Sequence, residues 1–251
     1  MPVTLAHPAA VLPLRGLGLP LAAMVIGAMV PDLPLFTRWL SAYWFTHSWT
    51  GVVTADLAIT LLLLAFWDRF GRDALVDTAP ALVRDRLPAQ ARIGRRAWLL
   101  APVAAVIGSA SHVVWDAFTH SGRWGVRNVA WLHEQHGPLR GDAWAQHASG
   151  VLGLVVVGLA MAAHLRRHPA GPSRPRRLPA ATLPVAFATT VLASAATGLT
   201  HLAVGSGLHL AAFWAAVAGI IALGALVIGL GVAWALAPAA IAPEVSDPVA
   251  P

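Results

Sequence analysis

Long apolar runs separated by short polar segments dominate this sequence. Six runs have the character of membrane-spanning helices: Leu17–Val30, Gly51–Trp67, Ala97–Trp115, Ala148–Leu165, Ala181–Val204 and Leu208–Leu236. A helix needs about 20 apolar residues to cross the hydrocarbon core of a bilayer. The pattern therefore predicts an all-α, polytopic transmembrane helix bundle of about six spans, although the first run is short and ends at Pro31.

The composition supports this class. Hydrophobic residues make up 57% of the 251 positions and charged residues only 11%, and the mean hydropathy is +0.67. A soluble domain carries about 25% charged residues, so this composition excludes a disordered chain and almost any soluble enzyme. Cysteine is absent from the sequence, which also excludes disulfides and thiolate metal sites.

Two polar segments carry most of the arginine. One spans residues 68–96 and the other is the Pro-rich stretch RRHPAGPSRPRRLP after the fourth run. Helix parity puts both on one side, which the positive-inside rule makes cytoplasmic, and the formal charge of +6 then reflects membrane anchoring rather than nucleic-acid binding. We expect a motif-bearing membrane domain (1–165), a basic cytoplasmic linker (166–180) and a two-span segment (181–251) whose C-terminus is cytoplasmic.

The densest polar motif, His112…Asp116…His120, lies at the end of the third run. Residues four apart differ by about 40° around a helix, so His112 and Asp116 share one face. Imidazole and carboxylate both suit zinc or manganese, and ionisable groups at membrane depth usually face a functional interior. His120 either folds back toward the same ion or binds a second one. The alternative is a His–Asp hydrogen bond that only clamps two helices.

Other polar residues are expected on the same side as this motif. Asp32, His47 and His147 flank the first, second and fourth runs, and with the motif they offer enough ligands for one or two divalent ions. Singly, each also fits the role of a helix cap or interfacial anchor. Asp56, inside the second run, is either a partner that orients a ligand histidine or a helix-contact hydrogen bond.

The order of several short motifs resembles a known group of proteins. The motifs are Ala6-His7-Pro8, Val30-Pro31-Asp32, Phe45-Thr46-His47-Ser48, Ser111-His112 with Asp116 and Thr119-His120, and Gln146-His147-Ala148-Ser149. They resemble a domain-of-unknown-function family of bacterial membrane proteins. That family in turn resembles the membrane-bound metal-dependent hydrolases of the bacterial inner membrane and, more distantly, zinc-dependent phospholipase C. The resemblance covers residues 1 to about 160 and leaves the last two spans outside it.

The resemblance implies a multi-pass protein of the bacterial inner membrane with a divalent metal site. The ligands that it implies are His7, Asp32, His47, His112, Asp116 and His120. His7 reaches the same side as Asp32 if the N-terminal residues form a re-entrant half-helix, broken by the prolines and glycines between residues 13 and 20. Otherwise His7 caps an interfacial helix.

The expected activity is metal-assisted hydrolysis at the non-cytoplasmic membrane face, on a lipid or envelope phosphoester. Glu134 or Asp142 would then act as the base, and Arg127 or Arg140 would hold the phosphate. Binding lipid headgroups is the plainer role of these arginines. The alternatives to an enzyme are an ion transporter and a metal-stabilised scaffold. Membrane lipids are the expected partners, nucleic acid is not, and the oligomeric state stays open.

Overall fold

A computed structural model describes residues 4–37 and 39–238, which are almost entirely helical. The elements of the first half are η1 (Thr4–Ala10), η2 (Leu12–Gly16), α1 (Leu21–Gly27), η3 (Val30–Asp32), α2 (Leu33–Phe36), α3 (Leu40–Thr46), α4 (Trp49–Gly51), η4 (Val52–Asp56), α5 (Leu57–Phe66), η5 (Trp67–Gly71), α6 (Arg72–Thr78) and α7 (Ala81–Arg84). After these come α8 (Arg95–Thr119), α9 (Trp124–Asn128), α10 (Ala130–His133), β1 (Gln135–His136), β2 (Leu139–Arg140), α11 (Gly141–Arg166), α12 (Thr182–Ala203) and α13 (Leu208–Leu236). The two short strands form an antiparallel hairpin.

Five helical stretches are long and apolar enough to cross a membrane, which confirms the all-α polytopic bundle. They are Trp49–Thr78, Arg95–Asn128, Gly141–Arg166, Thr182–Ala203 and Leu208–Leu236. The first expected span differs, because it is a shorter apolar stretch, Leu21–Phe36. At 1.5 Å per residue it is about 24 Å long, less than the hydrocarbon core of about 30 Å. Pro31 and Pro34 lie in the short helical turns that end it, where proline cannot donate a backbone hydrogen bond.

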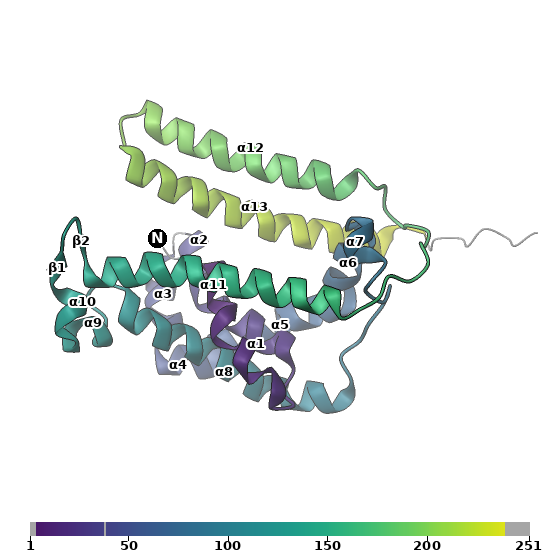
Figure 1. Cartoon of the computed structure of the whole chain (residues 1–251), viewed down its shortest axis with the longest axis horizontal. Helices are drawn as coiled ribbons and strands as arrows, with labels where there is room; N and C mark the ends of the chain where they lie inside the picture. Colours follow the sequence, from purple (N-terminus) through teal and green to yellow (C-terminus); the bar gives the residue numbers. More distant parts are fainter. Residues whose placement is uncertain (1–3, 38, 239–251) are drawn as a thin grey trace, which may run out of the picture.

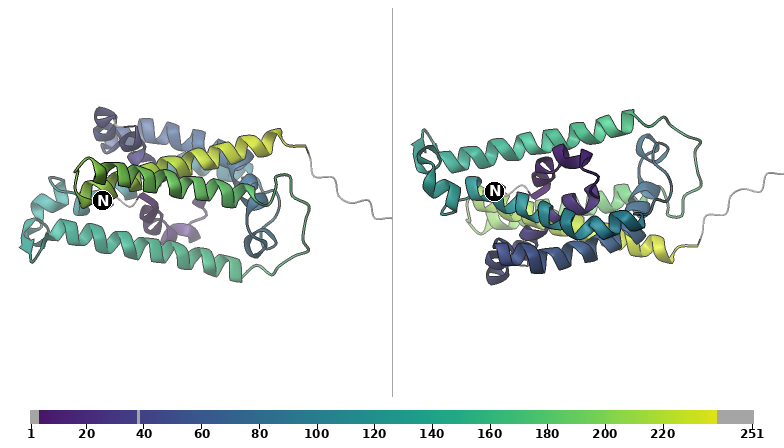
Figure 2. Two further views of the ribbon diagram at one scale, coloured as in Figure 1. Left: turned by 90° about the horizontal axis from the view of Figure 1, so that it is seen from above. Right: turned by 90° about the horizontal axis from the view of Figure 1, so that it is seen from below.

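Two of the short N-terminal helices, η1 and α1, bury residues inside the bundle, whereas η2 buries none. The purple N-terminal segment lies between α11 and the α8 and α5 helices, and the α12–α13 hairpin covers another side (Figures 1 and 2). α1 packs against α8 and α5, while η1 packs against α11. Met24, Leu64 and Ala104 are fully buried in the core between these helices. The helices η1 and α1 are therefore held where α5, α8 and α11 meet.

Small residues bring the backbones of α1 and α8 into direct contact. A Cβ atom at Gly108 would overlap the carbonyl oxygen of Met24, and one at Gly27 would lie 2.6 Å from the carbonyl oxygen of Ala105. Ser109 Oγ donates to the Gly27 carbonyl at 3.1 Å. Small residues allow such close approach of helices in membranes. The carbonyls at the end of α1 therefore lie against the turn of α8 that precedes His112.

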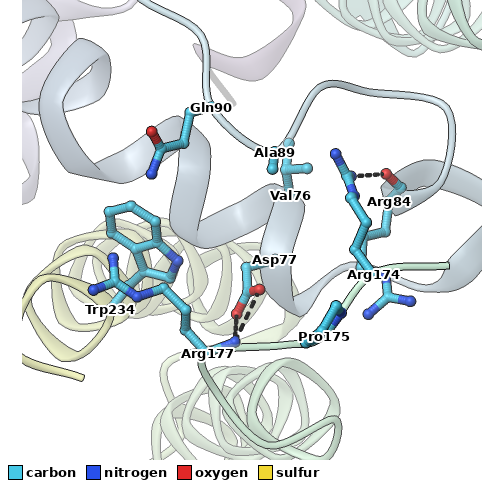
Figure 3. A pocket seen from close by; sticks show the side chains of 9 residues that line it. All are labelled: Val76, Asp77, Arg84, Ala89, Gln90, Arg174, Pro175, Arg177 and Trp234. Carbon is cyan, nitrogen blue, oxygen red and sulfur yellow. Dashed lines mark hydrogen bonds between the residues drawn. The ribbon is translucent and has the colours of Figure 1, made fainter. Parts of the chain in front are cut away.

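The two arginine-rich segments lie at one end of the bundle, opposite α9, α10 and the β-hairpin (Figure 1). Three arginines of the second segment donate to main-chain carbonyls elsewhere in the chain. Arg174 donates to Arg84 and Leu87, and Arg176 donates to Asp77 and Ala79. Arg177 donates to Ala237 and Pro238 at the end of α13. The Asp77 carboxylate accepts from the main-chain N–H group of Arg177 (Figure 3). It also accepts from the main-chain N–H group of Leu178. The linker thus ties the end of α13 to α6 and α7.

Candidate metal centre

Four buried side chains from three parts of the chain converge near the other end of the bundle. Asp32 ends η3, His47 follows α3, and His112 and Asp116 lie one turn apart on α8. One ligand atom from each lies within 4.8 Å of the others. We call these four residues the metal-site group, because together they could hold a metal ion.

The separations within the metal-site group match a compact coordination shell. His47 Nε2 lies 3.3 Å from His112 Nε2, 3.6 Å from Asp32 Oδ1 and 3.3 Å from Asp116 Oδ2. His112 Nε2 lies 3.5 Å from both of those carboxylate oxygens. Ligand atoms about 2.0–2.2 Å from a tetrahedral zinc ion lie about 3.3–3.6 Å from one another. All five separations fit a single small cation at the centre.

Both histidines of the group are oriented by main-chain carbonyls. His47 Nδ1 donates to the Tyr43 carbonyl at 2.8 Å, and His112 Nδ1 donates to the Ala28 carbonyl at 2.8 Å. A carbonyl oxygen only accepts, so each Nδ1 carries a proton and each Nε2 is the atom left to bind a metal. Metal-ligating histidines are typically held in this way. The close contact of α1 with α8 brings the Ala28 carbonyl to His112.

The two carboxylates have oxygens that no protein group satisfies. Asp32 Oδ1 and Asp116 Oδ2 are buried and have no hydrogen-bond partner among the described residues. The other oxygen of Asp32 accepts from Thr4 Oγ1 at 2.5 Å. A buried carboxylate oxygen without a hydrogen-bond donor is costly, since it loses its hydration. A divalent cation between these two oxygens would compensate both charges, so the donor set fits such an ion.

The protonation of His47 is coupled to this arrangement. Burial lowers the pKa of its imidazole, but the carboxylates of Asp116 and Asp32, 3.3 and 3.6 Å from its Nε2 atom, outweigh burial and raise that pKa above its ordinary value. A metal ion binds only the unprotonated nitrogen, so binding must displace a proton from His47. Affinity for the metal should therefore fall as the pH is lowered.

His7 and His120 lie on the opposite side of the Asp116 carboxylate. His7 Nε2 and His120 Nδ1 each lie 3.2 Å from Asp116 Oδ1, and the His7 ring stacks on His112 at 3.9 Å. The short 3₁₀ turns of η1 and η2 bring His7 here beside Thr4. A cavity of about 10 Å³ lies against His7, Asp116, His120 and Gln146, which is room for one water molecule or one ion.

Two other predicted residues lie differently from the expectation. Asp56 is fully buried in the π-helical segment η4, but neither of its oxygens has a hydrogen-bond partner among residues 4–37 and 39–238. It therefore makes neither of the two hydrogen bonds that the sequence suggested. His147 is exposed, and the preceding Gln146 reaches the site instead, with its Nε2 atom 2.9 Å from His120 Nε2.

The residues proposed for acid–base and phosphate roles lie outside the metal-site group. Glu134 is exposed between α10 and β1, Arg127 is exposed on α9, and Asp142 pairs with Arg140 at 3.3 Å. In the described part of the chain, no hydrogen bond or ion pair joins them to the metal-site group, and their roles stay predictions. Sequence reasoning missed Thr4, whose hydroxyl donates to Asp32 across 28 residues of chain, because no local pattern marks that contact.

Comparison with known proteins identifies a family but no characterised relative. A family model described as "Domain of unknown function (DUF4184)" matches residues 1–236. The match confirms the expected kind of family, but it runs through α12 and α13, so the expectation that these helices lie outside the resemblance is wrong. No curated protein and no solved structure matches the chain.

Proposed function

We propose that this chain, which belongs to the family described as Domain of unknown function (DUF4184), is a metal-dependent hydrolase of the bacterial inner membrane. The strongest support is the metal-site group, in which two oriented Nε2 atoms and two unsatisfied carboxylate oxygens converge. A bound divalent ion lowers the pKa of a water molecule that it holds and polarises the bond under attack. The spacing favours zinc, and the ligand types also suit manganese.

Access to the centre supports an enzyme rather than a sealed site. The small cavity beside Asp116 shares His120 and Gln146 with an open cleft of about 410 Å³. The His120 side chain is 20% exposed, whereas those of His47 and His112 are fully buried. A molecule in the cleft would therefore reach the centre past His120, at the end of α8.

Hydrolysis of a phosphoester breaks the P–O bond to the alcohol, places the hydroxide of water on phosphorus and returns a proton to the leaving oxygen. With one ion bound, His120 is suitably placed to accept a proton, because it lies between the cleft and Asp116. A second ion beside Asp116 Oδ1 would use His7 and His120 as ligands instead. The number of ions per chain distinguishes these two versions.

The test combines metal analysis with turnover. The full chain, reconstituted in lipid nanodiscs with zinc or manganese, is assayed against phospholipids and polyprenyl phosphates. We expect bound metal and turnover in the natural protein, and neither in Asp116→Ala. His164→Ala is the matched control, since His164 is exposed at the far end of α11. A metal-loaded protein that turns over none of these phosphoesters would contradict the proposal.

One observation favours a scaffold as the second candidate. Four protein ligands complete a tetrahedron, which is typical of structural zinc sites. In that case chelation would lower the melting temperature without any activity to lose.

A further inference from the structure

The open cleft beside the metal centre is built from both halves of the chain. Leu40 and Trp44 of α3 line it together with Phe213 of α13, and His120 and Gln146 lie at the end that adjoins the small cavity. The cleft of about 410 Å³ lies within the usual range for small-molecule sites. Its apolar walls and polar end suit a molecule that is itself amphiphilic.

Arg123 lies beside the aromatic wall of this cleft, and one of its guanidinium nitrogen atoms has no hydrogen-bond acceptor among the described residues. Its guanidinium carbon is 4.7 Å from the centre of the Trp44 ring and 5.8 Å from that of Tyr43. Its Nη2 atom is buried and has no hydrogen-bond partner in the described part of the chain. No carboxylate of the described residues pairs with it either. An anion is the ligand that would satisfy this group, and guanidinium binds phosphate in bidentate fashion.

The turn after α8 presents Arg123 and His120 to the same region. Gly122 has a φ of +76°, which L-residues with side chains rarely adopt, and it reverses the chain directly after His120. The main-chain N–H of Arg123 donates to the His120 carbonyl at 3.2 Å. The turn thus places His120 beside Asp116 and Arg123, three residues later, beside the Trp44 ring.

Resting on the proposed function, we infer that the substrate is an amphiphilic phosphoester, whose phosphate is held by Arg123 and whose apolar chain lies between Trp44 and Phe213. Tyr43 lines the same cleft, with its ring 5.8 Å from the Arg123 guanidinium carbon. The α12–α13 hairpin then contributes one wall of the substrate site.

Binding of non-hydrolysable probes tests this assignment without relying on turnover. Octylphosphonate, methylphosphonate and inorganic phosphate are equilibrated with nanodiscs that contain the full chain, and uptake by empty nanodiscs is subtracted. We expect octylphosphonate to bind most tightly. Arg123→Gln should weaken it about tenfold or more, as the loss of hydrogen bonds between charged groups does. Phe213→Ala should weaken octylphosphonate several-fold and leave methylphosphonate unchanged.

Matched variants separate this site from general charge and packing effects. Arg96→Gln removes an equal charge at the other end of the bundle, and Phe187→Ala shortens an exposed phenylalanine of α12; neither should alter binding. Arg123→Lys keeps the charge and should retain an intermediate affinity, while unchanged metal content shows that each variant is folded. Equal binding by inorganic phosphate would show a free-phosphate site and overturn the amphiphile. Loss of affinity in Arg127→Gln but not in Arg123→Gln would overturn the assignment of Arg123.

Failure of the Arg123 binding site and failure of the hydrolase give different results. Arg123-dependent binding without turnover of any phosphoester would leave the binding site standing and remove the hydrolase. Turnover that does not change in Arg123→Gln, with equal probe affinity, would leave the hydrolase and remove this substrate site.

Discussion

The region of residues 4–166 and the α12–α13 hairpin are both built from apolar helices, yet they bury different side chains. Every buried polar or charged residue of the described chain except Thr190 lies in the first region. These residues include Asp32, His112 and Asp116, whereas the hairpin buries mainly alanine, glycine and aliphatic side chains. An intramembrane ionisable residue is costly and marks a site of function. The contrast therefore places the candidate metal ligands in the first region, and among the described residues the hairpin adds none to that group.

The largest effect should come from removing a ligand of the metal-site group. We expect His112→Ala and Asp116→Ala each to abolish bound metal and to lower the melting temperature, because the ion stabilises the folded state. His201→Ala is the equivalent change in the hairpin, where His201 stacks on Trp214, and it should leave metal content unchanged. The measurement is elemental analysis of purified protein with a thermal melt. Full metal occupancy in both first-region variants would leave only the helix-clamp role of His112 and Asp116.

The helices α1 and α8 are in closer contact at Gly108 than α13 is with its neighbours at Gly224. Gly108→Val places a side chain against the Met24 carbonyl, so α1 must move away from α8. This movement separates the Ala28 carbonyl from His112 Nδ1 and breaks the hydrogen bond between them. Overpacking of this kind costs about 1–3 kcal/mol, and metal affinity should fall as well. Gly224→Val in α13 is the control, because a Cβ atom there meets nothing within 4 Å. Equal melting temperatures and metal affinities in the two variants would show that the α1–α8 contact does not position the site.

Much of this contrast can be predicted from the sequence. Apolar run lengths identify five of the six expected spans, and helical spacing places His112 beside Asp116. The first run is not a full span because it forms only the short helix α1, which is followed by the short helical turns that contain Pro31 and Pro34. The sequence favours His147 as the site residue, whereas Gln146 lies there. Neighbouring positions point about 100° apart around a helix, and the sequence of an almost uniformly apolar helix does not indicate which of its faces points toward the site. The contact of Thr4 with Asp32 depends on tertiary folding of the N-terminus, which no local pattern encodes.

Both regions contain a buried threonine, but only the Thr4 hydroxyl donates to a residue of the metal-site group. Thr4→Val removes the donor to Asp32 Oδ2 while keeping a similar volume. Loss of such a partner of a metal ligand costs about 10–100-fold in metal affinity. Thr190→Val is the control in the hairpin, where the hydroxyl only donates to the carbonyl of Ala186 in the preceding turn. Competition with a chelator of known affinity measures both. If the Thr4 variant held metal as tightly as the control, Asp32 would not depend on the N-terminal segment.

The smallest effect should follow from Gln146→Ala, which leaves all four residues of the metal-site group in place. Gln146 contacts His120 Nε2 at 2.9 Å and lines both cavities. Its loss frees the His120 ring to turn away from Asp116, so turnover should fall about fivefold, the equivalent of one hydrogen bond of about 1 kcal/mol, while the tightly bound metal stays. Ser194→Ala removes a hydrogen bond of similar kind inside the hairpin and should change neither quantity. Turnover and metal content are measured on the same preparation. Loss of metal in Gln146→Ala would instead show that His120 is itself a ligand, which requires the second ion beside Asp116.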